Sequence, residues 1–293
     1  MSGKRLTFIA CMVAATALFG AGSVWLKLSF VELGPLWTTV LRFGIAAICF
    51  LPFLVAWKPA APLWSWRMMP SAVCMAGVFL SAALAVNFTT ATTAGFFFAL
   101  PMLFAPAFAW ISMRRKYGVR TVILQAIVIF GLYLLCCGGG TPSFGLGEFM
   151  GLCASAFYAA AVVLGERVLQ DIDPMGLTAG QLMVTFVLSL GVALALEPMP
   201  DYGSLAPSTW ATVVALGAFA TCLASVLQNI ALKRISATIV AFITSTEPVF
   251  TAVFAYFLLA ESMNMVGWVG AAIIVGGTMI ASLPEDARLA KPR

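Results

Sequence analysis

The sequence contains no histidine and few charged residues. Of its 293 residues, only 9% are Asp, Glu, Lys or Arg, whereas 62% are hydrophobic, and the mean hydropathy is +1.04. The absence of histidine removes the most common general base, the most common zinc ligand and the usual neutral-pH switch. A water-soluble domain of this length could not cover its surface with so few charges. The composition therefore indicates an integral membrane protein.

Several motifs that would indicate other classes are also missing. The sequence has no GxxxxGK[ST] phosphate loop, which excludes ATP hydrolysis by that route. Its seven cysteines lie in apolar runs without CxxC spacing, so we expect no metal site, no disulfide and no cofactor. Without histidine, Ser–His and His–metal catalysis are excluded as well, and we expect no enzyme. The scattered Lys and Arg residues form no face for nucleic acid, although the net charge is +5.

Ten apolar runs are long enough to cross the hydrocarbon core of a bilayer, which needs roughly 20 residues per helix. The predicted fold is therefore an all-α integral membrane protein, with ten transmembrane helices joined by short loops. The predicted spans are 7–26, 35–57, 68–90, 92–113, 119–138, 146–168, 174–196, 208–232, 236–259 and 263–283.

Basic residues are distributed asymmetrically between alternate loops. With the N-terminus in the cytoplasm, fourteen Lys and Arg residues lie on the cytoplasmic side, Lys27 alone lies on the opposite side and Arg42 lies within a span. This bias predicts a multi-pass protein of the plasma membrane with both termini in the cytoplasm. The fourteen residues are Lys4, Arg5, Lys58, Arg67, Arg114, Arg115, Lys116, Arg120, Arg167, Lys233, Arg234, Arg288, Lys291 and Arg293.

The two halves of the sequence resemble each other. Pro35 and Pro174, each at the start of a predicted span, are 139 residues apart, and Pro101 and Pro248, each within a span, are 147 residues apart. The first predicted span therefore has a counterpart in the sixth. This correspondence argues that the first span belongs to the mature fold and is not a cleaved signal peptide.

We predict two five-helix repeats, residues 1–140 and 141–293, which meet in the Gly-rich segment 136–147. Because five is odd, the second repeat enters the membrane from the opposite side. Inverted repeats of this kind recur in secondary transporters, with the substrate site near the midplane between the repeats. Internal repeats also occur in channels, so a channel stays open as an alternative, as do an intramembrane enzyme and a membrane scaffold.

Three segments carry a resemblance to a known family. They are LRFGIAAICFLPF (41–53), TTATTAGFFFALPMLFAPAFAW (89–110) and RISATIVAFITSTEPVFTAVFAYFLLAES (234–262). These segments resemble the EamA-type members of the drug/metabolite transporter superfamily. Within it the chain looks most like bacterial amino-acid and metabolite exporters, in particular the aromatic amino-acid exporter branch. The resemblance implies a ten-helix fold with a central cavity and export of small metabolites without ATP. A drug or other metabolite carrier of the same fold is the alternative.

Two prolines interrupt predicted spans near the middle of the membrane. A proline cannot donate to the carbonyl four residues earlier, so we expect Pro101 to free the carbonyl of Phe97 and Pro248 to free that of Thr244. Free carbonyls at membrane depth are tolerated only against protein or a wet cavity. The two carbonyls are therefore expected to lie beside a cavity, where a substrate ammonium could use them.

Glu247 and Arg42 are charged residues within predicted spans, and such residues require an explanation because burying a charge in a bilayer is costly. Glu247 could pair with Arg42, be protonated and hydrogen-bonded, or bind substrate or a coupling proton. We expect it to hold the broken ninth span in place beside the cavity and to tune the electric field there. On this view its substitution would cost more stability than binding.

The expected function is secondary transport of small amphipathic metabolites, with aromatic or apolar amino acids favoured, by alternating access. The expected partners are a small-molecule substrate and the lipid bilayer, and the chain is expected to be a monomer or a weak homodimer. GWVGAAIIVGG (267–277) indicates either close helix packing or dimerisation. The predicted cavity residues are Phe19, Ser81, Phe97, Pro101, Tyr158, Gln228, Thr244, Glu247 and Pro248, and the predicted structural or gating polar residues are Arg42 and Gln181.

Overall fold

The computed structural model describes residues 3–30, 32–88, 96–114, 118–137, 145–259 and 264–283, and over these residues the only regular structure is helical. Within them, ten helical segments are long and apolar enough to cross a membrane, which confirms the predicted class and number of spans. The segments are Arg5–Ser29, Pro35–Ala56, Trp66–Ala85, Phe96–Met113, Val119–Cys136, Leu146–Val168, Pro174–Leu196, Pro207–Leu232, Ala237–Leu258 and Met265–Ser282.

Several of these segments are built from more than one helix. The eighth consists of α9, η2 and α10 in succession, and the ninth consists of α11 followed by α12. Some of the predicted positions lie outside the described residues. These are the span ends at 89–90, 92–95, 138 and 263 and most of the Gly-rich join 136–147. The helices are α1 (Gly3–Ser29), α2 (Pro35–Ala56), η1 (Trp66–Met68), α3 (Met69–Phe88), α5 (Pro101–Met113), α6 (Val119–Cys137), α7 (Leu146–Val168), α8 (Pro174–Leu196), α9 (Pro207–Gly217), η2 (Ala218–Leu223), α10 (Ala224–Leu232), α11 (Ala237–Thr244), α12 (Glu247–Leu259) and α13 (Met265–Ser282).

Prolines mark the starts of many helices. Pro35 begins α2, Pro174 begins α8 and Pro207 begins α9. Proline suits the first turn because its fixed φ is helical and the N–H that it lacks has no partner there anyway. The two prolines that interrupt predicted spans behave in the same way. Pro101 begins α5, and Pro248 is the second residue of α12, so each lies just after a break in its span.

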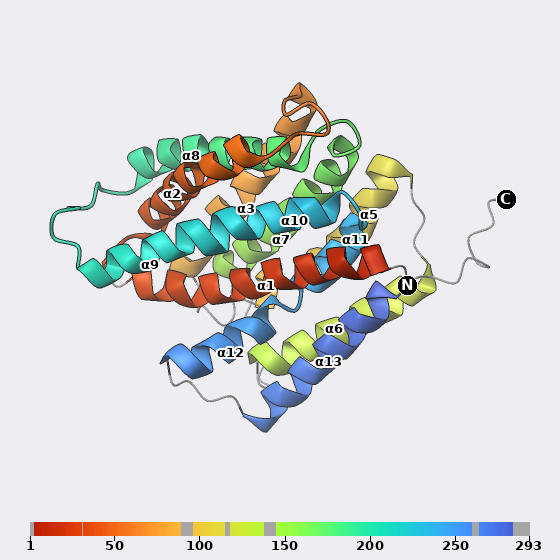
Figure 1. Cartoon of the computed structure of the whole chain (residues 1–293). Helices are drawn as coiled ribbons and strands as arrows, with labels where there is room; N and C mark the ends of the chain where they lie inside the picture. The colour runs from red at the N-terminus through yellow and green to blue at the C-terminus, as the bar shows by residue number, and fades with distance from the viewer. Residues whose placement is uncertain are drawn as a thin grey trace.

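The helices pack into a bundle with a separate pair at one side. The most extensive contact is between α3 and α7, and α2 also packs along α8. Figure 1 shows α6 and α13 side by side, apart from the bundle formed by α1–α3 and α7–α10. The two helices approach closely at Gly131 and Gly270, where a Cβ on Gly270 would lie 2.6 Å from the Gly131 carbonyl oxygen. Close packing against α6 therefore accounts for Gly270 and Gly277 of segment 267–277, whereas Gly276 faces open space.

At the end of the bundle where α1 is connected to α2, two carboxylates accept hydrogen bonds from the N-terminal turns of other helices. Glu32 accepts hydrogen bonds from the Ala206 amide (2.9 Å) and the Thr209 hydroxyl (2.8 Å) at the start of α9. Glu197, after α8, accepts from the amides of Leu36 (2.9 Å) and Trp37 (3.0 Å) at the start of α2. Each carboxylate satisfies helix N-terminal donors on another element. We call these contacts the Glu32 clasp.

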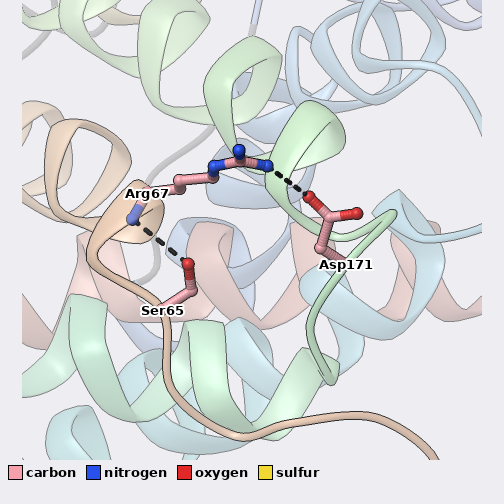
Figure 2. A network of polar contacts seen from close by, with 3 residues as sticks. All are labelled: Ser65, Arg67 and Asp171. Atoms are coloured by element: carbon pink, nitrogen blue, oxygen red, sulfur yellow. Dashed lines mark hydrogen bonds and ion pairs between the residues drawn. The ribbon is translucent and has the colours of Figure 1, made fainter.

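The opposite end of the bundle, where α2 leads into α3, carries a related set of contacts, the Asp171 clasp. The Arg67 guanidinium donates to Asp171 at 3.1 Å, and the Ser65 hydroxyl accepts from the Arg67 amide (Figure 2). Asp173 also accepts from the Ala60 amide, at 3.2 Å. The Arg67–Asp171 pair is largely exposed, so by itself it contributes little to stability. Asp171 lies 139 residues after Glu32, the offset that relates Pro174 to Pro35.

Candidate functional site

A cavity of about 150 Å³ lies between the two halves of the chain. It is bounded by α1, α2, α3, α7 and α10 and by the break between α11 and α12. Its lining residues are Phe19, Gly22, Ser23, Leu26, Phe30, Pro35, Thr39, Arg42, Met75, Val78, Phe79, Ala82, Ala83, Phe98, Ala154, Tyr158, Ser225, Gln228, Thr244 and Glu247.

The cavity reaches only one end of the bundle. Phe30 and Pro35, which line it, belong to the connection between α1 and α2. Toward the opposite end, the space between the helices is filled by fully buried side chains of the main apolar core, among them Met68, Leu169 and Leu232. The structure therefore has a closed end at the Asp171 clasp and a cavity that extends toward the Glu32 clasp.

The structure brings six of the predicted residues together around this cavity. Their side chains come from α1, α2, α7, α10, α11 and α12, so residues far apart in sequence converge on one space. Phe19 and Tyr158, which the 139-residue offset aligns, both line it. The six are Phe19, Arg42, Tyr158, Gln228, Thr244 and Glu247.

The other predicted cavity residues lie elsewhere among the described residues. Ser81 is buried on α3, and Phe97 is buried in the main core with its ring edge-on to Phe96. Pro101 and Pro248 occupy the first turns of α5 and α12, where they start helices. Their effect on the cavity is therefore through the course of the backbone.

One expectation about the prolines is wrong. The Phe97 carbonyl is not free, because it accepts hydrogen bonds from the Ser155 hydroxyl of α7 (2.5 Å) and from the Leu100 amide (3.3 Å). The chain turns before Pro101, so a local donor and a neighbouring helix replace the lost helical bond. Thr244 differs, because among the described residues the structure gives no donor for its carbonyl. The two helix breaks are thus unequal.

Gln181 belongs to a separate buried polar network. Its amide nitrogen donates to the Ser71 hydroxyl at 3.1 Å, and its amide oxygen accepts from Asn229 at 2.9 Å. Asn229 also donates to the Thr178 hydroxyl. The network joins α3, α8 and α10 through hydrogen bonds between buried side chains, and the side-chain oxygen of Asn229 has no partner among the described residues. Gln181 therefore joins neighbouring helices. Arg42, which the 139-residue offset aligns with Gln181, lines the cavity instead.

Tyr158 is the centre of a polar cluster at the cavity wall. Its hydroxyl donates to the Gln228 side-chain oxygen at 2.6 Å and lies 2.9 Å from the Thr244 hydroxyl. Thr244 in turn lies within hydrogen-bond distance of the Val240 carbonyl, at 3.0 Å. The cluster links α7, α10 and α11 at the point where the ninth span breaks.

Glu247 is the first residue of α12 and is half-buried against the cavity. Its carboxylate accepts a hydrogen bond from the Ser23 hydroxyl of α1 at 3.1 Å. No nitrogen of Arg42 lies within 4.0 Å of this carboxylate, although both residues are described and line the same cavity. A direct Arg42–Glu247 ion pair is therefore not formed, and the two charges face a common space.

Arg42 is held on the α2 side of the cavity. Its side chain is buried, its Nε donates to the Thr221 hydroxyl at 3.0 Å, and its guanidinium carbon lies 4.8 Å from the centre of the Phe79 ring. Thr221 lies in η2, a π-helical turn, and donates to the Leu216 carbonyl five residues earlier. Single π-helical turns within α-helices occur frequently at functional sites.

Sequence reasoning missed several lining residues. Ser23 lies four residues after Phe19 and thus on the same face of one helix, a relation that could have identified it. Thr221 gave no such signal, because an apolar run does not reveal a π-helical turn. Among the described residues no group of three or more His, Cys, Asp or Glu side chains could hold a metal ion. The cavity thus offers hydrogen bonds, two opposite charges and an aromatic wall.

Comparison with known families agrees with this architecture. The profile of the EamA-like transporter family matches residues 6–137 and again residues 145–283. The chain belongs to the EamA-like transporter family. The two matched segments together cover nearly all of the ten spans.

Similar proteins extend over nearly the whole chain. An "uncharacterized transporter" of Archaeoglobus fulgidus is 25% identical over 280 residues, covering 96% of this chain and 87% of its own. The "uncharacterized transporter YetK" of Bacillus subtilis is 22% identical over 292 residues, covering 96% and 88%. A solved crystal structure that is 20% identical has the same fold, with a TM-score of 0.79 over 94% of this chain and 96% of that one. This multi-pass membrane protein is therefore similar to transporters.

Proposed function

We propose that the protein is a secondary transporter that exports small amphipathic metabolites, with aromatic and apolar amino acids as the favoured class. The observation that carries the proposal is the cavity, in which Arg42 and Glu247 face a common space without pairing. Buried charges in membrane proteins are costly and are retained where they serve a substrate or ion path. A zwitterion would supply the opposite charge that each of them lacks.

The apolar wall of the cavity supports the preference for aromatic and apolar side chains. Phe19, Phe79 and Phe98 line it together with aliphatic residues, and Tyr158 supplies a polar edge. Aromatic rings favour edge-to-face and offset contacts with one another. A substrate with an aromatic side chain would bury that side chain against this wall while its charged groups face the polar side.

We infer that the chain consists of two inverted repeats, 1–140 and 141–293, which alternately open the cavity to the two faces. The separate family matches to 6–137 and 145–283 support this division. The basic bias supports an inner-membrane orientation with cytoplasmic termini. The Glu32 clasp would then face the periplasm. Labelling of a cysteine introduced at Gly203 from the cytoplasmic side alone would overturn this orientation.

Flux in proteoliposomes tests the proposal. Purified protein should carry radiolabelled L-phenylalanine down its gradient without nucleotide, and excess unlabelled L-phenylalanine on the opposite side should drive transient counterflow. Liposomes that contain Glu247→Gln protein provide the matched control. Flux only with added ATP and a partner ATPase, or no flux of any amino acid, would contradict the proposal.

The same experiment separates the alternative functions. A drug or other metabolite carrier would show counterflow with cationic drugs or sugars but not with amino acids. A channel would give flux without counterflow and without saturation. An enzyme would return a chemically altered label, which chromatography of the recovered material would detect.

A further inference from the structure

The guanidinium of Arg42 has one occupied edge and one open edge. Nε–H donates to the Thr221 hydroxyl at 3.0 Å. Neither terminal NH₂ group donates a hydrogen bond to any of the described residues. Arg42 is only 7% exposed and lines the cavity. A buried guanidinium with two unoccupied NH₂ groups has lost water contacts that a ligand can replace.

Two groups fix the direction of that open edge. The Thr221 hydroxyl already donates to the Leu216 carbonyl at 2.9 Å, so it is left as an acceptor for Nε–H. The aromatic rings of Phe79 and Phe43 lie 4.8 Å and 5.6 Å from the guanidinium carbon and restrict the plane of the group. The π-helical turn η2 therefore orients a cation on α2, a different element.

We propose that the two terminal nitrogens of Arg42 form an end-on carboxylate-binding subsite of the cavity, with Thr221 as its positioning residue. The subsite rests on the proposed function and adds to it the orientation of the substrate. The carboxylate lies against Arg42, and the ammonium lies toward Glu247, whose carboxylate already accepts from Ser23.

The chemistry of the cavity favours a carboxylate over a phosphate. Two parallel N–H groups match the two oxygens of a planar carboxylate in a bidentate arrangement. A phosphate group carries nearly two charges and would place the second opposite the carboxylate of Glu247, which lines the same space. One guanidinium and one carboxylate therefore select a ligand that has one charge of each sign.

Ligand analogues that lack one group each test the subsite. Binding to full-length protein in detergent is measured for L-phenylalanine, for phenethylamine, which lacks the carboxylate, and for 3-phenylpropionate, which lacks the ammonium. Wild type should bind L-phenylalanine at least about tenfold more tightly than phenethylamine. Arg42→Gln should lose that preference and should leave phenethylamine binding unchanged.

Substitutions at Thr221 separate positioning from folding. Thr221→Val removes the acceptor for Nε and should weaken L-phenylalanine binding about tenfold while phenethylamine binding stays the same. Thr221→Ser keeps the hydroxyl and should restore L-phenylalanine binding to within about twofold of wild type. A purely structural role for Thr221 would weaken both ligands equally and would overturn its assignment.

The outcomes distinguish the two proposals. If wild type and Arg42→Gln bind L-phenylalanine equally, the subsite is wrong and the proposed substrate class stands. If wild type binds 3-phenylpropionate but not L-phenylalanine, and Arg42→Gln binds neither, the subsite stands and the amino-acid substrate is wrong. If wild type binds none of the three, both are overturned. If Arg42→Gln fails to fold, Arg42→Lys takes its place. Lysine keeps the positive charge but lacks the two parallel N–H groups of the guanidinium, and the same loss of preference for L-phenylalanine over phenethylamine is expected.

Discussion

Glu247 keeps its carboxylate beside the cavity, where the Ser23 hydroxyl donates the one hydrogen bond that this carboxylate accepts from a described residue. The sequence led us to expect that replacing it would cost more stability than binding, because it holds the broken ninth span in place. A pair with Arg42, one of the three alternatives, would add to that cost because the buried partner charge would be left alone. The structure removes that reason, since the two groups form no direct pair. A glutamine at this position can still accept from Ser23 and has nearly the same shape.

We therefore expect Glu247→Gln to fold normally and to lose transport. Flux of L-phenylalanine should fall at least about tenfold, because an ammonium loses a charge-assisted hydrogen bond. Thermal unfolding of the purified variant should occur close to the wild-type temperature. Ser23→Ala is the matched control, since it keeps the carboxylate and removes only its donor. A strongly lowered unfolding temperature for Glu247→Gln would restore the structural role.

The sequence predicted the individual charges of the site better than their partners. Glu247 and Arg42 stand out because charges are rare in apolar runs, and both line the cavity. The acceptor for Arg42 is Thr221, 179 residues away along the chain. Contacts of this range depend on how helices pack and, here, on one π-helical turn. Neither follows from hydropathy.

At the scale of elements, α6 and α13 pack closely through glycine. A Cβ on Gly270 would lie 2.6 Å from both the Gly131 carbonyl oxygen and the Leu135 amide nitrogen, which are backbone atoms that cannot move independently. Gly270→Ala should therefore force the helices apart and destabilise the protein by about 1–3 kcal/mol.

The same helix contains a control for this prediction. Gly276 lies on α13 with nothing within 4 Å of the position of a Cβ, so Gly276→Ala should leave stability unchanged or slightly raised. Chemical or thermal unfolding in detergent compares the two variants. Equal stability of both would show that the close approach of α6 and α13 is not required.

The Glu32 clasp gives the protein a dependence on acid pH. Donation from the Ala206 amide, and then from the Thr209 hydroxyl, lowers the pKa of Glu32 from its ordinary value of 4.5. A lowered folded-state pKa gives a stabilisation that is complete above the unfolded-state value and is lost as the pH falls through the folded-state value. Below about pH 4.5 the clasp should therefore weaken progressively.

Unfolding temperatures measured between neutral and acid pH test this effect. Glu32→Gln should be less stable than wild type at neutral pH, and the difference should shrink as the pH falls. Asp201→Asn is the control, because Asp201 is an exposed carboxylate whose side chain, among the described residues, accepts a hydrogen bond only from the Gly203 amide of its own loop. A constant difference between wild type and Glu32→Gln at every pH would contradict the assignment.

Helix boundaries could be predicted from the sequence because the ends of apolar runs and the positions of prolines mark them. The starts of α2 and α8 at Pro35 and Pro174 follow from the preference of proline for the first turn. The donor that satisfies the Phe97 carbonyl was not predictable. Ser155 reaches it from α7, and nothing in the sequence indicates which of many serines packs against a helix break.

At the scale of the whole molecule, both clasps are closed while the cavity reaches only one end. The Glu32 clasp lies at the open end, so its contacts do not form the barrier there. They tie α2 to the end of α8 through Leu36 and Glu197, and the two helices also pack along their lengths. We infer that α2 and α8 stay together when the cavity changes its opening.

A cross-link between these elements tests that inference. Cysteines at positions 36 and 197, joined by a short bifunctional thiol reagent in a background without native cysteines, should leave flux of L-phenylalanine close to that of the unlinked protein. A cross-link between positions 39 and 154, which line the cavity from α2 and α7, is the comparison and should reduce flux. Loss of flux on linking 36 to 197 would show that these helices separate during transport.

The pairing of one guanidinium with one carboxylate around a single cavity has an electrical consequence. Moving one elementary charge across a membrane potential changes the free energy by about 2.3 kcal/mol per 100 mV. The cavity lining contains one basic side chain, Arg42, and one acidic side chain, Glu247, so with both ionised the empty site has no net charge, and a zwitterion adds none. We expect a potassium diffusion potential of either sign, imposed with valinomycin, to leave L-phenylalanine flux unchanged. A flux that follows the sign of the imposed potential would mean that an uncompensated ion crosses with the substrate.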